Sequence, residues 1–188
     1  MRILYNKEMR GFTLIELIIV ISILTIFTVL AIPNFRGYSR VLTVKENAKE
    51  IRSILWEGQS LALAPKSDDA VSYQIDFSLN DSKFTLKEKK ITSAVTDVSA
   101  IELDKQVALD KIEFGDKTEI NLIDISFDTG YRNEDAEQTT AGAIRFLDSS
   151  GNEIKEDKLI ITLYSKISDA KYKVTVDRIL NSITVSGA

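Results

Sequence analysis

The feature that most constrains this chain is an apolar run near its start, from Phe12 to Ile32. A helix of that length would be roughly 31 Å long, which matches the roughly 30 Å hydrocarbon core of a bilayer. The preceding residues 1–11 carry three basic side chains and one acidic side chain. A basic flank followed by a membrane-length run predicts a short cytoplasmic leader, a single spanning helix and an exported C-terminal portion.

Glu16 is the one charged residue inside this run. A carboxylate in the hydrocarbon region costs about 2–4 kcal/mol on insertion scales, so its presence calls for an explanation. A cleaved secretory signal has a shorter apolar region, and Val29-Leu30-Ala31 is a weak cleavage site for one. A plain single-pass anchor is a second alternative. Neither alternative explains Gly11 or Glu16.

The heptapeptide Gly11-Phe12-Thr13-Leu14-Ile15-Glu16-Leu17 resembles the processing motif of type IV pilins and type II secretion pseudopilins. In that family a prepilin peptidase cleaves after the Gly, on the cytoplasmic side of the apolar run. The resemblance implies cleavage between Gly11 and Phe12, followed by N-methylation of Phe12. It covers the leader and the apolar run, as far as about residue 33.

The resemblance also implies a role for Glu16 in subunit assembly. Cleavage creates a cationic amine on Phe12, and Glu16 lies in the first turn of the helix, where the dipole favours an anion. The carboxylate of one subunit and the amine of a neighbour stabilise each other when both are buried, whereas either alone is unfavourable. The alternative is that Glu16 only extends its carboxylate toward the headgroups.

Pro33 ends the apolar run and predicts a kink, because it cannot donate to the carbonyl of Val29. Beyond it, apolar residues recur at steps of three and four, which is typical of a helix with one packed face. We expect Trp56 to border that face as a core residue. The positions of the stripe are Val41, Val44, Ala48, Ile51, Leu55, Gly58 and Ala62.

Residues 65–188 change to a two-residue period, beginning with the alternation from Tyr73 to Leu79. Many short alternating segments with turn signals predict an antiparallel sheet or sandwich. The fold class is therefore α+β, with a leader over 1–11, a transmembrane or filament-core helix over 12–33, an amphipathic continuation over 34–64 and a β-rich domain over 65–188.

Several strands are expected in more detail. Short strands are predicted at 107–109 and 112–114, and a phase change between Leu122 and Ile123 predicts a bulge or burial on both faces. Residues 92–104 and 130–142 are expected to be mobile loops.

The C-terminal third resembles the H-type minor pseudopilins, through Ala143–Asp148, Ile160–Leu163 and Lys173–Val176 in that order. Some members of that group bind DNA through a basic C-terminal tail. This chain has no basic residue after Arg178, so DNA binding is not expected. A major pilin, or a membrane-anchored binding module that never polymerises, remains an alternative. The partners implied are prepilin peptidase, other pilin or pseudopilin subunits, the inner-membrane assembly platform and membrane lipid.

The 188-residue chain has a net charge of −4 and contains no His and no Cys. This composition excludes His-based triads, disulfides and most transition-metal sites. Nucleotide-binding and nucleophile-elbow motifs are also missing, so we expect a structural protein without enzymatic activity or cofactor. Asp128, Asn133, Glu134 and Asp135 could hold calcium, but they fail the EF-hand pattern and fit solvated loop charge better.

Overall fold

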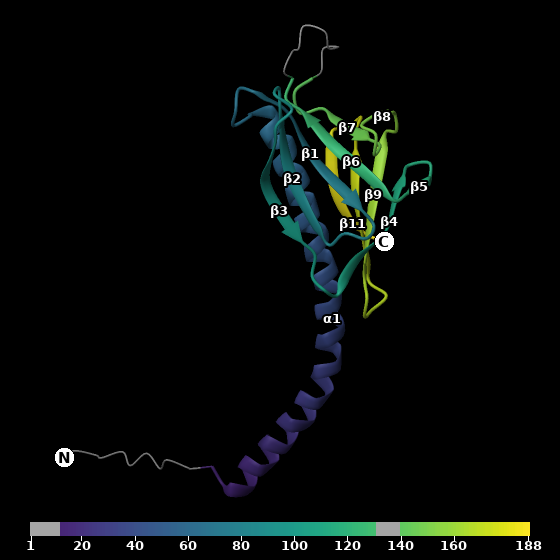
Figure 1. Ribbon diagram of the computed structural model, residues 1–188. Helices are drawn as coiled ribbons and strands as arrows, with labels where there is room; N and C mark the ends of the chain where they lie inside the picture. Colours follow the sequence, from purple (N-terminus) through teal and green to yellow (C-terminus); the bar gives the residue numbers. More distant parts are fainter. Residues whose placement is uncertain (1–11, 131–139) are drawn as a thin grey trace, which may run out of the picture. The chain divides into compact units, whose positions relative to one another are not determined.

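The computed structural model describes residues 12–130 and 140–188, and of residues 30–36 only the backbone. Its contacts divide the chain into one unit that ends at Ser39 and a second from Arg40 to Ala188. One helix is followed by the strands of two sheets (Figure 1). The elements are α1 (Leu14–Leu63), β1 (Ala70–Ser78), β2 (Lys83–Lys90), β3 (Val95–Glu102), β4 (Val107–Phe114), β5 (Glu119–Ile120), β6 (Leu122–Asp128), β7 (Ile144–Leu147), β8 (Glu153–Ile154), β9 (Lys158–Ser165), β10 (Lys171–Asp177) and β11 (Ser182–Gly187).

The helix α1 is 50 residues long and ends just before the Ala64-Pro65 breaker. It is assigned as helical through Pro33, so the kink expected there stays a prediction. Gly11 and the rest of the leader lie outside the described residues.

Within the second unit, α1 buries the apolar stripe that the sequence predicts. Val44, Ala48, Ile51, Leu55 and Ala62 are each fully buried. The prediction of burial was wrong for two residues. Val41 is 39% exposed, at the start of the packed segment, and Trp56 is 61% exposed. Trp56 follows Leu55 by one residue, which turns it about 100° away from the packed direction.

Two antiparallel sheets complete the core. The first has the strand order β3-β2-β1-β6-β7-β8 and the second has the order β11-β10-β9-β4-β5. Apolar side chains from both sheets and from α1 form one buried cluster. The largest fully buried side chains in it are aromatic: Tyr73, Phe77, Phe84, Phe127 and Phe146. The predicted α+β class, with a helix followed by an antiparallel β domain, is confirmed.

Strand boundaries differ from the prediction in three places. Residues 92–104 are not a loop, because β3 pairs with β2 along its length. The segments 107–109 and 112–114 form one strand whose register shifts between Leu109 and Lys111. The phase change at Leu122 is not a bulge: β5 belongs to the five-stranded sheet and β6 to the six-stranded sheet, so the chain crosses between sheets there. The alternative of burial on both faces holds for the second half of β6, where four consecutive residues from Ile125 to Asp128 are buried.

Candidate functional site

The start of α1 is organised by Thr13 and Glu16. A Glu16 carboxylate oxygen accepts hydrogen bonds from the backbone N–H of Thr13 and from its hydroxyl, both at 2.8 Å. In return, the backbone N–H of Glu16 donates to Thr13 Oγ1 at 3.3 Å. This is a capping box, in which the residue before the helix and the third helical residue satisfy each other's backbone donors.

The sequence carries the signal for this cap, a Thr followed three residues later by Glu at the start of an apolar run. Sequence reasoning placed Glu16 in the first turn but missed Thr13 as its partner. The carboxylate therefore has a structural role within its own helix. Phe12, directly before the cap, is 86% exposed.

The apolar side chains of the first unit are uncovered. From Leu14 to Val29 the large aliphatic and aromatic side chains are between 48% and 77% exposed. A contiguous apolar surface of this kind marks a site of contact with lipid or protein. Among the described residues, no helical stretch has both the length and the apolarity needed to cross a bilayer.

Three hydroxyl residues interrupt this apolar surface, and each is satisfied within the helix. Ser22, Thr25 and Thr28 donate to the carbonyls of Ile18, Ile21 and Leu24, each at 2.8 Å. A hydroxyl bonded to the carbonyl one turn earlier leaves no free donor on the helix surface. These residues are therefore compatible with an apolar environment around the helix.

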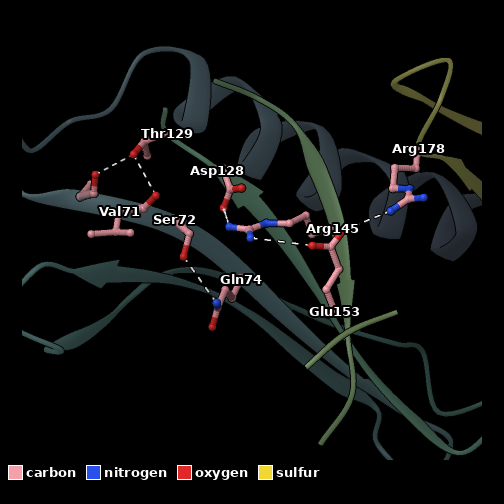
Figure 2. A network of polar contacts seen from close by, with 9 residues as sticks. Val71, Ser72, Gln74, Asp128, Thr129, Arg145, Glu153 and Arg178 are labelled. Atoms are coloured by element: carbon pink, nitrogen blue, oxygen red, sulfur yellow. Dashed lines mark hydrogen bonds and ion pairs between the residues drawn. The ribbon is translucent and has the colours of Figure 1, made fainter. Parts of the chain in front are cut away.

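A polar network links the two sheets in the second unit (Figure 2). Arg145 on β7 contacts Asp128 at 2.5 Å and Glu153 at 4.0 Å. Arg178, which follows β10, contacts Glu153 at 3.1 Å and Asp157 at 3.4 Å. Because Glu153 belongs to β8, this chain of ion pairs joins the last strand of the six-stranded sheet to the five-stranded sheet.

Asp128 is not part of a solvated acidic loop, which corrects the interpretation of that residue. Its side chain is 3% exposed and its Oδ2 atom has no partner in the described part of the chain. Burial raises the pKa of Asp128, although the Arg145 guanidinium opposes the shift. Asn133, Glu134 and Asp135, the other residues considered for calcium, lie outside the described residues. Within the described ranges, no cluster of acidic side chains could hold a metal ion.

A pair of neighbouring carboxylates lies on the outer side of the six-stranded sheet. Asp76 on β1 is directly opposite Asp124 on β6, and Asp76 also pairs with Lys87. Burial, and then repulsion from Asp76, raise the pKa of Asp124 to about 6. This pair affects the pH dependence of stability, and the described residues offer no reacting group beside it.

Two solved structures of the minor pseudopilin EpsH from the type II secretion system of Vibrio cholerae are similar to this chain. One has 12% sequence identity and a TM-score of 0.47, and the match covers 76% of this chain and 92% of that chain. The other has 14% identity and a TM-score of 0.44, with coverage of 77% and 95%. No curated protein matches the chain. Residues 6–32 match the family described as the prokaryotic N-terminal methylation motif, which confirms the resemblance found at residues 11–17.

Proposed function

Because residues 6–32 carry the prokaryotic N-terminal methylation motif, we propose that this chain is a structural subunit of a pilin-like filament. Prepilin peptidase cleaves it between Gly11 and Phe12 and methylates the new amine of Phe12. The apolar segment 12–33 then anchors the subunit in the inner membrane and, after assembly, packs in the filament core. The β-rich domain is exported, and the protein has no enzymatic role.

The capping geometry supports a specific part for Glu16. Cleavage leaves one residue, Phe12, ahead of the cap at Thr13, so the new amine lies at the helix end. The Glu16 carboxylate is already oriented there by Thr13. One carboxylate oxygen accepts both of these bonds, which leaves the other oxygen for a cationic amine of a neighbouring subunit. Pairing of the two charges relieves the cost of burying either alone.

Within this class, we propose a minor pseudopilin of the H type in a type II secretion pseudopilus. The support is the order of the C-terminal strand motifs, which resembles that of the H-type group. Its partners are other pseudopilins, through the N-terminal helix, and the inner-membrane assembly platform.

Processing is the first test. The mature chain is expected to begin at N-methyl-Phe12, and Gly11→Val is expected to block cleavage because a branched Cβ obstructs the scissile bond. Mass spectrometry of the N-terminus in cells with and without the peptidase measures both. A wild-type chain that retains Met1 would favour the membrane-anchored binding module instead, and a start beyond Ala31 would indicate an ordinary secretory signal.

Assembly is tested at Glu16. Glu16→Val is expected to insert and be cleaved normally, yet to fail in assembly, because a neighbour's Phe12 amine is left unpaired. Loss of one partner of a buried ion pair costs about 3–5 kcal/mol, a factor of more than a hundred in subunit addition. The measurement is the amount of subunit in purified filaments relative to the amount in the membrane.

Glu16→Gln is the matched control, because Gln preserves the capping box while removing the charge. Intermediate incorporation is expected. Full incorporation of the Gln variant would mean that the cap, and not the charge, is what assembly needs. Full incorporation of Glu16→Val would exclude a role for Glu16 in subunit docking. The alternative, that the carboxylate only extends toward the lipid headgroups, would then be favoured.

A further inference from the structure

The outer edge of β3 is a free strand edge in the second unit. β3 is the first strand of the six-stranded sheet, and no described strand pairs with its far side (Figure 1). Its register with β2 is regular from Ser99 to Glu102 and shifts only upstream, between Leu86 and Lys87 of β2. An uncovered regular edge presents unpaired backbone N–H and C=O groups, which can pair with an added strand.

A groove of about 350 Å³ runs beside this edge. Residues of α1, including Ile54, line one side of the groove, and the strand segment from Ser99 to Glu102 lines the other side. Ser99 Oγ donates to Glu57 at 2.9 Å, so this side chain and the helix face the same space. An added strand would therefore place every second side chain toward the helix, because side chains alternate along a strand.

The groove carries only acidic charge. Glu50, Glu57 and Glu102 line it, and no Lys or Arg does. None of these three carboxylates forms an ion pair within the described part of the chain, whereas many of the protein's other acidic side chains do. Glu50 and Glu57 are two turns apart on one side of α1, so they follow the direction of the groove.

We propose that the β3 edge and this groove bind an extended, basic segment of another protein by strand addition. The backbone of the segment pairs with Ser99–Glu102, and Lys or Arg side chains at alternate positions contact Glu50 and Glu57. Main-chain pairing supplies affinity in this recognition mode, and the alternate side chains supply selectivity. The proposal does not depend on filament assembly, because none of its residues lies in the first unit.

The test uses the full chain in detergent and a capped heptapeptide in which Lys and Val alternate. Two peptides serve as controls, one with Glu in place of Lys and one with a central Pro, which cannot continue a strand ladder. Affinity is measured by fluorescence anisotropy at two salt concentrations. Hydrogen exchange followed by mass spectrometry reports on the backbone amides of residues 95–102.

The Lys peptide is expected to bind and to slow exchange in β3, and both controls are expected to fail. The double variant Glu50→Gln/Glu57→Gln should weaken binding about tenfold, the combined effect of two partly exposed ion pairs, and should reduce its salt dependence. The matched control Asp81→Asn/Glu156→Gln removes two charges elsewhere and should leave the affinity unchanged.

Three outcomes of the affinity measurements would overturn the proposal: no binding of the Lys peptide, equal binding of the Glu or Pro peptide, or equal weakening by the two double variants. Binding without protection of residues 95–102 would also overturn it, because the peptide would then lie elsewhere. Glu16→Val is expected to leave peptide binding intact, so failure of this site and failure of the filament role give different results.

Discussion

Gly58 lies where α1 packs tightly against the six-stranded sheet. A Cβ at this position would lie 2.9 Å from two ring carbons of Phe127 and 3.0 Å from a methyl carbon of Leu86. Both neighbours are fully buried, so neither can move aside without disturbing the core. The apolar stripe placed Gly58 on the packed face of the helix, and the structure supplies the reason why this position has no side chain.

Gly58→Ala is therefore expected to lower the free energy of unfolding by about 1–3 kcal/mol through overpacking, despite the gain of up to about 1 kcal/mol in helix propensity. Gly37→Ala is the matched control, because a Cβ at Gly37 would meet no atom within 4 Å and only the propensity gain remains. Chemical denaturation of both variants measures the difference. A Gly58→Ala protein as stable as the wild type would show that the sheet yields to the added methyl group at little cost.

Asp124 gives a pH-dependent prediction. Its pKa of about 6 in the folded chain exceeds its ordinary value of 3.8, so folding disfavours its charged form. This destabilisation is complete above about pH 6 and disappears as the pH falls toward 4. Asp124→Asn is therefore expected to be more stable than wild type by on the order of 1–2 kcal/mol at pH 7, after allowance for solvent screening, with no difference near pH 4.

Asp148→Asn is a control for which the change in stability is expected to have the opposite sign. Hydrogen bonds, first from the backbone of Asn152, lower the pKa of Asp148, so its charged form stabilises the fold above its ordinary pKa. This variant should be the less stable protein from pH 7 down to about pH 4, and its deficit should shrink only below the ordinary pKa of 3.8. Urea unfolding from pH 7 to below pH 4 distinguishes the two cases, and a deficit for Asp124→Asn at pH 7 would contradict the assignment.

At the scale of elements, β3 shows what the sequence could not reveal. Strands with one buried face alternate clearly, as from Tyr73 to Leu79, and these were predicted correctly. β3 lies at a sheet edge and buries no side chain fully, so its apolar residues do not stand out from those of a loop. Its identity as a strand depends on pairing with β2, which is a contact between segments and not a property of either.

The ion pair between the buried Asp128 and the half-buried Arg145 joins β6 to β7 and predicts an asymmetric mutational effect. Arg145→Gln leaves the buried carboxylate of Asp128 without its cation, and should lower the free energy of unfolding by about 2–4 kcal/mol. The double variant Asp128→Asn/Arg145→Gln should recover part of that loss. A thermodynamic cycle measures the coupling, and additive effects of the two changes would show that the pair does not interact.

At the scale of the molecule, the buried core lies wholly within the second unit, from Val44 to Ile183. A fragment of residues 34–188 is therefore expected to be soluble and to unfold cooperatively without a metal. Circular dichroism and urea titration measure this. A disordered fragment would mean that the division between the exposed and the packed half of α1 is misplaced.

The start of the chain was easier to predict than its interior. Residues 11–17 carry their information in seven adjacent positions, and the apolar run is readable from length alone. Trp56 was wrongly predicted to be a core residue, because helical spacing gives the direction of the packed face but not how many neighbouring side chains it includes. The phase change near Leu122 predicted a bulge or burial on both faces, but not the crossing, because the sequence does not indicate that β5 and β6 belong to different sheets.

The crossing between sheets also determines the order in which the fold can be completed. The chain is synthesised from its amino terminus, so all strands of the six-stranded sheet are present once Ile154 has been added. The apolar strand β4 must still wait for β9, its long-range partner, because β5 covers only two of its residues. Until Lys158–Ser165 has been synthesised, most backbone groups of β4 on this edge have no partner strand. Unpaired strand edges in an incompletely folded chain promote aggregation. A chain truncated before residue 158 should therefore be insoluble, and should not fold into a shorter soluble protein.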